Sequence, residues 1–284
     1  MRHPTLLVAC ATGALLVAGC APKSAKENVD RAFQDVNVIE ESNLSEVMLT
    51  VADPNEAVSF FARTASEKPD DIAPHRGLAV SLVRAGRFDE AAPAWEKVVS
   101  FKDATGDDRV AWADALVRSG DWARADTVLD AVPPTIETFD RYRLEAMLAD
   151  GNKEWKRADS FYETAAGLTT SPAGILNNWG YSKLSRGDFA EAERLFNQAI
   201  RNDSTLFTAK NNLVMSRGAQ RNYTLPVIPM SQTERAQLLH TMALSAIKLG
   251  DVKTGETLLR EAVDTHPQHF QAASRALEAL QTSG

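Results

Sequence analysis

The chain has 284 residues, of which 44% are hydrophobic and 24% charged, and its formal net charge is -7. An acidic chain is a poor candidate for binding nucleic acid, which requires clustered Lys and Arg to displace phosphate counterions. The hydrophobic fraction is ample for a core, and the moderate Gly and Pro contents impose no long disordered tract.

The N-terminus has the layout of a secretory signal. Arg2 and His3 precede the uncharged run "TLLVACATGALLVAG", which is followed at once by Cys20 and a polar stretch. A charged start, a short apolar stretch and small residues at the break are typical of a signal peptide. A membrane span needs about 20 apolar residues, so this run is too short to remain as one.

The stretch "LVAGC" resembles a bacterial lipobox. The resemblance implies that residues 1–19 form a lipoprotein signal peptide, that the chain is cut before Cys20, and that Cys20 carries lipid. The alternative is a plain signal peptide that happens to contain a cysteine. Lipoproteins kept in the inner membrane usually carry Asp after the cysteine, whereas this chain has Ala21. The resemblance therefore favours a lipid anchor on the periplasmic face of the outer membrane.

Residues 20–52 are interpreted as the acylated N-terminus and a polar tether, with one short helix in "KENVDRAF". The segment 53–69 then predicts a helix. Asp53 is a good N-cap, Pro54 suits the first helical position, and Glu56 completes a pattern like a capping box. This helix lacks a well-matched partner helix before it.

A sequence repeat begins after this helix. "HRGLAVSLVRAGRFDEA" (75–91) aligns with "RVAWADALVRSGDWARA" (109–125) at an offset of 34 residues without a gap. The unit recurs as "NNWGYSKLSRGDFAEA" (177–192) and as "HTMALSAIKLGDVKTG" (240–255). Apolar residues recur at three- and four-residue spacing within each unit, which predicts amphipathic helices.

A period of 34 residues with small-residue and Gly punctuation resembles the tetratricopeptide repeat, a pair of helices A and B. The resemblance implies an all-α solenoid in which a small residue of helix A faces a small residue of helix B. The helix A small positions are Ala79, Ala113, Gly180 and Ala243, and the turn positions are Gly86, Gly120, Gly187 and Gly250. The helix B small positions are Ala91, Ala125, Ala192 and Gly255, the large helix B positions are Trp95, Leu129, Phe196 and Leu259, and the terminal prolines are Pro69 and Pro267.

The repeat pattern is broken in two places within the predicted solenoid, residues 53–223. Residues 139–166 form a degenerate unit, with two extra residues expected between Gly151 and Ala158. The stretch 207–223 matches the preceding helix A, but residues 224–231 contain "TLPVIPM", whose two prolines forbid a regular helix. This linker either covers the solenoid or offers an edge to a partner. Residues 232–284 are assigned to a final repeat and a capping helix at 268–280.

The sequence carries none of the common catalytic motifs: no Walker loop, no GxSxG, no HExxH and no paired cysteines. His266 and His269 flank Pro267 in "HPQH", where a loop and a cap are favoured over metal ligands. The scattered acidic residues are typical of a solvated face. We therefore expect a non-enzymatic protein with no cofactor and no metal.

What remains is recognition by the concave face, which the A helices form in solenoids of this kind. Asn is suited to hold an extended peptide, because its amide offers a donor and an acceptor to a backbone; the alternative is that the Asn side chains only cap or face solvent. The groove positions carried over from the family are Arg76, Val80, Val83, Arg84, Val110, Asp114, Val117, Arg118, Asn177, Tyr181, Leu184, Asn211, Met215, His240 and Leu244.

The order of a short tether, the "NNWGYSKLSRGDFAEAERLF" core and the late "TERAQLLHTMALSAIKLGDVKTGETLLREAV" unit resembles the repeat lipoprotein of tight-adherence (Flp) pilus loci, the D component of that system. The resemblance implies a role in secretin placement or pilus assembly, with proteins of that machine as partners. The alternative is a general envelope-assembly scaffold unrelated to pili.

Overall fold

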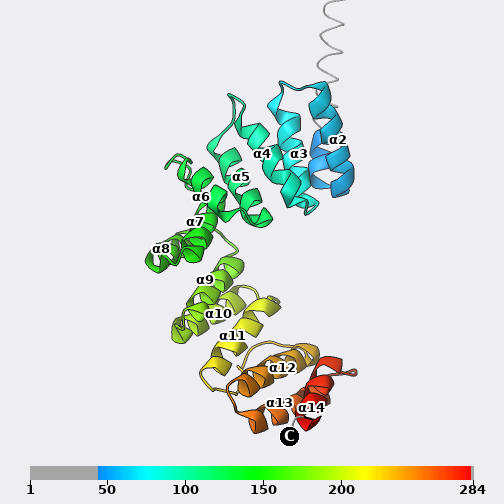
Figure 1. Ribbon diagram of the computed structural model, residues 1–284, viewed down its shortest axis with the longest axis vertical. Helices are drawn as coiled ribbons and strands as arrows, with labels where there is room; N and C mark the ends of the chain where they lie inside the picture. The colour runs from blue at the N-terminus through cyan, green and yellow to red at the C-terminus, as the bar shows by residue number, and fades with distance from the viewer. Residues whose placement is uncertain (1–43, 283–284) are drawn as a thin grey trace, which may run out of the picture.

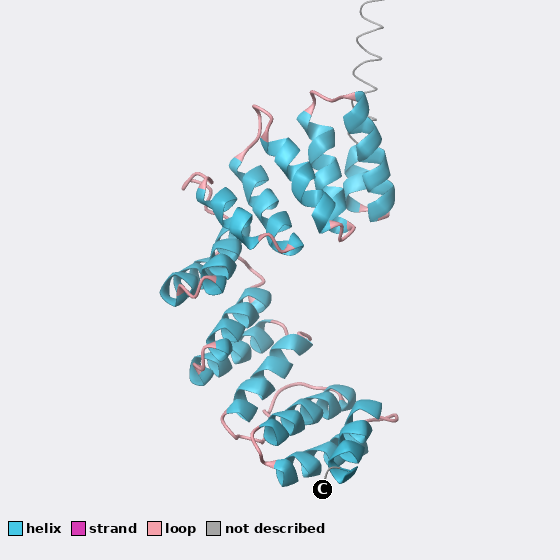
Figure 2. Ribbon diagram, viewed as in Figure 1, coloured by secondary structure: helices cyan, strands magenta, loops and turns pink. Residues whose placement is uncertain are grey.

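The computed structural model describes residues 44–282. The predicted signal peptide, Cys20 and the helix expected in "KENVDRAF" lie outside the described residues. Within residues 44–282 all regular secondary structure is helical and no strand occurs, as Figure 2 shows. The predicted all-α class is therefore confirmed.

The helices follow one another in antiparallel pairs, in which the first member is called the A helix and the second the B helix. The A helices are α3 (Ile72–Arg84), α5 (Gly106–Ser119), α7 (Phe139–Gly151), α9 (Ala173–Ser185), α11 (Phe207–Ala219) and α12 (Gln232–Lys248). The B helices are α4 (Phe88–Val99), α6 (Trp122–Asp130), α8 (Trp155–Gly167), α10 (Phe189–Asn202) and α13 (Val252–Thr265). α2 (Pro54–Glu67) precedes the pairs and α14 (Gln271–Thr282) follows them.

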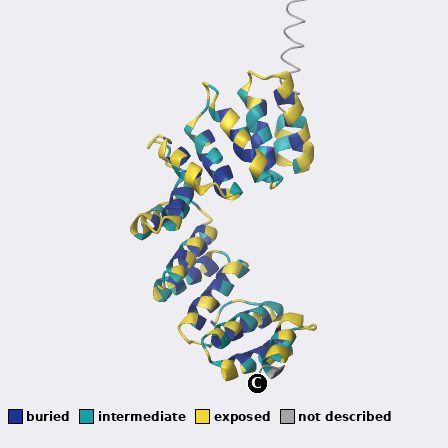
Figure 3. Cartoon of the chain, viewed as in Figure 1, coloured by how far each residue is buried: buried dark blue, intermediate teal, exposed yellow. Residues whose placement is uncertain are grey.

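The pairs stack into an elongated, curved solenoid with α2 near one end and α14 at the other (Figure 1). Each helix packs against the next one along the chain, and the A helices also contact the A helices of neighbouring units, as in α5 with α7, α9 with α11 and α11 with α12. These contacts, together with the hydrogen bonds from Arg76 to Asp108 and from Ser182 to Asp150, link the A helices into one inner row. Buried residues, dark blue in Figure 3, occur in every helix pair along the solenoid.

The predicted crossing of helices at small residues is confirmed. Ala79, Ala113 and Ala192 are fully buried. A Cβ atom added at Gly180 would lie 2.6 Å from the ring of Phe196, so the large residue of helix B fills the space that the glycine leaves. The small residue thus allows α9 and α10 to approach closely.

The predicted turn residues are also confirmed. Gly86, Gly120, Gly187 and Gly250 have φ of 70°, 90°, 81° and 86°, the left-handed region that glycine tolerates best. A non-glycine residue adopts the same conformation at Lys153, with φ of 63°.

Lys153 changes the interpretation of the unit at 139–166. It lies seven residues after the fully buried Ala146 and five before the fully buried Ala158, the same spacing that separates Ala79, Gly86 and Ala91. The large helix B position, four residues after Ala158, is the buried Tyr162. The expected two-residue insertion is therefore wrong: the unit has the regular length, and Lys153 rather than Gly151 makes the turn.

The segment that follows α11 is extended, as the two prolines predict. Arg221 takes the left-handed turn position with φ of 58°, and no helix forms before α12 in residues 222–231. Leu225 packs on the C-terminal core and Ile228 on the core around α10, whereas Val227 is fully exposed. The linker thus covers part of the solenoid where a B helix is missing, and it leaves one apolar side chain in solvent.

The N-terminal end of the solenoid extends into the segment assigned to the tether. Residues 44–50 are helical. The Arg84 guanidinium at the end of α3 donates to the carbonyls of Met48 (2.9 Å) and Ala52 (3.1 Å), which fastens this helix to the first A helix. Asp53 caps α2 by accepting from the backbone of Asn55, and Pro54 begins the helix, as predicted. Among residues 44–282, no helix has the length and apolar character that crossing a membrane requires.

Candidate functional site

The inner row of A helices presents one residue per unit at the position that follows the small residue, or in α11 the buried Val214 that stands in its place. In α9, α11 and α12 these residues are Tyr181, Met215 and Leu244, with 55%, 37% and 46% of their surface exposed. We call these three residues the apolar ladder. All three are groove positions predicted from the sequence, and the structure places them on successive contacting helices.

The first predicted groove residue, Arg76, makes bonds within the solenoid. Its guanidinium donates to both carboxylate oxygens of Asp108 at 2.8 and 2.7 Å and to the Asp103 carbonyl at 3.1 Å. Asp108 also closes the capping box of α5 with Thr105. Burial alone would raise the pKa of Asp108, but the bonds from Arg76 and Thr105 hold its pKa below the ordinary value. Arg76 thus joins α3 to α5, and Arg84 is likewise engaged with the N-terminal helix.

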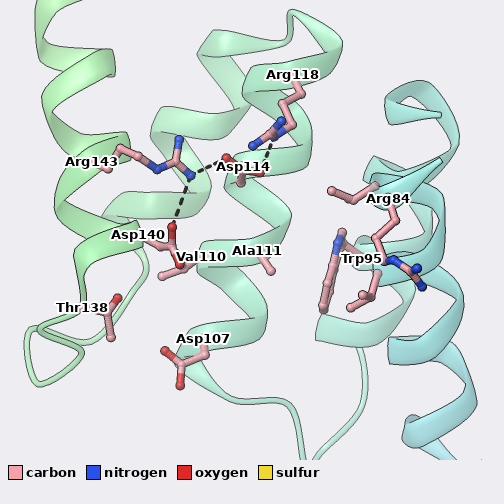
Figure 4. Close-up of a pocket in the computed structure, with 12 residues that line it drawn as sticks. Arg84, Trp95, Asp107, Val110, Ala111, Asp114, Arg118, Thr138, Asp140 and Arg143 are labelled. Carbon is pink, nitrogen blue, oxygen red and sulfur yellow. Dashed lines mark hydrogen bonds and ion pairs between the residues drawn. The ribbon is translucent and has the colours of Figure 1, made fainter. Parts of the chain in front are cut away.

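Asp114 lies at the centre of a small ion cluster, which Figure 4 shows. It accepts from Arg118 at 2.6 Å and from Arg143 of α7 at 2.7 Å. Arg143 was not predicted from the sequence, although it occupies the repeat position of Arg76 once Lys153 defines the unit. Its bond to Asp114 joins α5 to α7, as the Arg76 bond joins α3 to α5.

This ion cluster forms one wall of a pocket of about 410 Å³, called the charged pocket. Val80 and Val83 contribute apolar surface, and the buried indole Nε1 of Trp95 has no hydrogen-bond partner among the described residues. Val117, also a predicted groove residue, is buried in the core instead. The charged pocket is lined by Val80, Val83, Arg84, Trp95, Asp107, Val110, Ala111, Asp114, Arg118, Thr138, Asp140 and Arg143.

The two asparagines expected to hold a peptide are engaged between units. Asn177 is 9% exposed and accepts from the amide of Asn212 at 3.0 Å, which joins α9 to α11. Asn211 accepts from the Thr241 hydroxyl at 2.8 Å, which joins α11 to α12. These bonds use the carbonyl oxygens of both amides. Leu184, a further predicted groove residue, packs on the core around α10.

His240 lies at the C-terminal end of the inner row. Its ring centroid is 5.5 Å from that of Phe270, just before α14. Burial lowers the pKa of His240, so the neutral imidazole is favoured. His266 stacks on the same Phe270 ring and accepts from the Gln268 backbone, which caps the loop. Among residues 44–282 no cluster of three or more His, Cys, Asp or Glu side chains is arranged to hold a metal ion.

A second pocket of about 500 Å³ opens beside the apolar ladder and is rich in aromatic side chains; it is called the aromatic pocket. Trp122 and Trp155 line it from the first positions of α6 and α8, and both lie two residues after the left-handed turn. The shared repeat position of these tryptophans is a signal that the sequence carries. The full lining is Trp122, Met147, Asp150, Gly151, Trp155, Tyr162, Asn177, Asn178, Tyr181, Ser185, Thr208 and Asn212.

Asp150 is the charged residue of this lining. It accepts a hydrogen bond from the Ser182 hydroxyl of α9. Burial is the main influence on this carboxyl and raises its pKa. Burial and the nearby Asp150 charge likewise raise the pKa of the Tyr162 phenol. The pocket therefore combines aromatic walls with a carboxylate that is poorly compensated.

Comparison with known proteins agrees with this architecture. The tetratricopeptide repeat family model matches residues 72–97, which cover α3 and most of α4. No curated protein sequence matches the chain.

Solved structures share the fold at low sequence identity. The Cut9–Hcn1 hetero-tetramer of the APC/C matches with a TM-score of 0.55 and 14% identity over 83% of this chain, which spans only 47% of the matched one. A repeat protein from Parabacteroides merdae matches with a TM-score of 0.55 and 12% identity, covering 83% of this chain and 95% of that one. The C-terminal part of a repeat protein from Cytophaga hutchinsonii matches with a TM-score of 0.55 and 13% identity, covering 82% and 98%. The chain therefore folds as a tetratricopeptide-repeat solenoid, with the family's sequence signature on its first regular helix pair.

Proposed function

We propose that the chain is a non-enzymatic scaffold that binds protein partners on its inner row of A helices. A repeat solenoid presents an extended surface to partners rather than a catalytic centre. The observation that carries the proposal is the apolar ladder, Tyr181, Met215 and Leu244, exposed on three successive A helices. Exposed apolar side chains that follow one face are characteristic of an interaction surface.

The ladder can be tested against exposed apolar residues elsewhere. Leu168 and Val252 are 45% and 46% exposed but do not belong to the ladder, so Leu168→Ser with Val252→Ser is a matched control. Serine at all three ladder positions is expected to abolish co-purification of partner proteins from envelope membranes, with an unchanged melting midpoint. The control variant is expected to retain the partners. Retention of every partner by the ladder variant contradicts the proposal.

For the site of action, the proposal is the periplasmic face of the outer membrane, with Cys20 as the lipid-bearing residue. It rests on the "LVAGC" motif and on Ala21. Cys20→Ser should abolish metabolic labelling with palmitate and partitioning into detergent, since a hydroxyl does not replace the thiol in thioether formation. Persistent labelling of the variant would exclude this anchor.

The partner machine we propose is a tight-adherence (Flp) pilus system, in which the scaffold assists secretin placement or pilus assembly. The support is the resemblance of the sequence to the repeat lipoprotein of such loci. Deletion of the gene is expected to remove heat-resistant secretin multimers from outer membranes, and reintroduction of the wild-type chain is expected to restore them. Intact multimers with defects in other envelope assemblies would instead favour a general envelope scaffold.

A further inference from the structure

The aromatic pocket has a lining that differs in kind from the charged pocket. Trp122 is 41% exposed and Tyr181 is 55% exposed, so both rings are accessible from solvent. Trp155 and Tyr162 complete the aromatic part of the wall. The volume of about 500 Å³ lies within the range of pockets that bind ligands, and it accommodates a long side chain together with some backbone.

The lining contains one carboxylate and neither Lys nor Arg. Asp150 supplies this carboxylate, and it accepts a hydrogen bond from the neutral hydroxyl of Ser182. Taking a carboxylate partly out of water without a directly contacting cation is unfavourable, and Arg186 acts on Asp150 only through its more distant charge. A ligand cation that reaches Asp150 would relieve this cost.

Two cations at the C-terminal end of α9 are already engaged. Lys183 and Arg186 both bind Asp159 of α8, and Trp179 donates its indole N–H to the same carboxylate. Burial would raise the pKa of Asp159, but these three donors hold its pKa below the ordinary value. Asp159 is therefore compensated by charged donors in direct contact, whereas Asp150 has only the Ser182 hydroxyl, the Tyr162 phenol and the more distant charge of Arg186, which together do not offset its burial.

The aromatic walls suit the same kind of ligand. The face of an indole or phenol ring attracts cations, and a guanidinium group also stacks on it through its flat surface. The protein uses this arrangement itself, because the Arg186 guanidinium lies 5.4 Å from the centroid of the Trp155 ring. The net charge of -7 on the whole chain also steers basic partners toward it.

We propose that the aromatic pocket binds an arginine side chain of a partner protein, with Asp150 as its counter-ion and Trp122 and Tyr181 as its aromatic walls. The proposal rests on the function proposed above, in which the inner row binds protein partners. It adds a chemical preference to that surface. The preferred partner segment has an arginine between apolar residues, and the neighbouring apolar ladder contacts those apolar side chains.

The test compares three peptides that differ at one residue. The probes are acetyl-Gly-Leu-Arg-Leu-Gly-amide and the same peptide with citrulline or norleucine in place of arginine. Citrulline keeps the length and planar shape of arginine but is uncharged, because a carbonyl oxygen replaces one nitrogen of the guanidinium group. By calorimetric titration of the full mature chain, the arginine peptide is expected to bind about tenfold more tightly than the citrulline peptide.

Two pocket variants and one control variant locate the preference. Asp150→Asn keeps an oxygen that accepts from Ser182 and should reduce the affinity for the arginine peptide to that for the citrulline peptide. Glu137→Gln removes the same charge from an exposed residue outside the pocket and should leave the preference intact. Trp122→Leu, at a half-exposed position that does not endanger folding, should weaken binding of the arginine peptide about threefold to tenfold.

Each outcome bears on the proposal. Four results would overturn the proposal. They are equal affinities for the arginine and citrulline peptides, tighter binding of the norleucine peptide than of the arginine peptide, no binding of the arginine peptide at millimolar concentration, and a preference for arginine that survives Asp150→Asn. If one of these results is found and the ladder variant still loses its partners, only the arginine preference is refuted and the proposed scaffold function is retained. Retention of partners by the ladder variant would instead refute the scaffold surface itself.

Discussion

Replacing Gly180 with alanine would place a methyl group where α9 crosses α10. The added Cβ would lie 2.6, 2.8 and 3.1 Å from three carbons of the Phe196 ring. Contacts below 3.0 Å require a movement, and Phe196 is fully buried, so its ring cannot turn out into solvent. The strain must therefore be absorbed by moving the two helices apart.

The size of the effect follows from two opposing contributions. Overpacking a buried site costs about 1–3 kcal/mol, and three close contacts place this site in the upper part of that range. The higher helix propensity of alanine returns about 1 kcal/mol. We therefore expect a net loss of about 1–2 kcal/mol, which corresponds to a melting midpoint lowered by about 2–8 °C for a domain of this size.

The assay is thermal unfolding of residues 21–284 followed by circular dichroism, with Gly174→Ala as the control. Gly174 lies in the same helix, and a Cβ there would meet nothing within 4 Å. The control is therefore expected to be neutral or stabilised by up to about 1 kcal/mol. A Gly180→Ala variant as stable as the wild type would refute the close crossing at this position.

Three further predictions concern stability. Arg76→Gln should cost about 1–3 kcal/mol at pH 7, because it removes two charge-assisted bonds to Asp108. The pKa of Asp108 is lowered in the folded state, so this stabilisation is present above its unfolded pKa of about 4 and is lost as the pH falls through the folded pKa. In urea unfolding, the difference in stability between wild type and variant should therefore be smaller at pH 3 than at pH 7. An equal difference at both pH values would contradict this prediction. Lys153→Gly should raise the melting midpoint by relieving about 1 kcal/mol of left-handed strain, and a lower midpoint would argue against the turn assignment. Ile228→Ser should destabilise the chain by about 1–2 kcal/mol, whereas the fully exposed Val227→Ser should not; equal effects in thermal unfolding would contradict the packing of the linker.

The repeat could be predicted from the sequence wherever its residue preferences are strict. Ala79 and Gly86 mark the first regular unit because a close crossing admits only small side chains, and because glycine adopts a left-handed turn most easily. The preference for glycine is not absolute, however. Lys153 and Arg221 adopt the same turn at some cost, and the lack of a glycine at Lys153 makes the unit at 139–166 look longer than it is.

The candidate site was predictable in position but not in contacts. Repeat spacing places Arg76, Asn177 and Tyr181 on the inner row, and all three lie there. It does not indicate that the next unit supplies a carboxylate to Arg76 and an amide to Asn177, since these partners lie 32 and 35 residues away in the sequence. The A-helix positions of the repeat do not indicate the aromatic pocket, because its walls come from A and B helices together.

The bonds between successive A helices limit how the solenoid bends. Arg76 with Asp108 and Asn177 with Asn212 are directional contacts of 2.7–3.0 Å, and contacts of this kind weaken steeply when they lengthen by a fraction of an ångström. The apolar seams between A and B helices are non-directional and tolerate small sliding movements. The solenoid should therefore resist straightening more strongly than it resists tighter coiling. A tensile load between its two ends would be carried first by these inner bonds, and a ligand that draws neighbouring units together would encounter less elastic resistance than one that forces them apart.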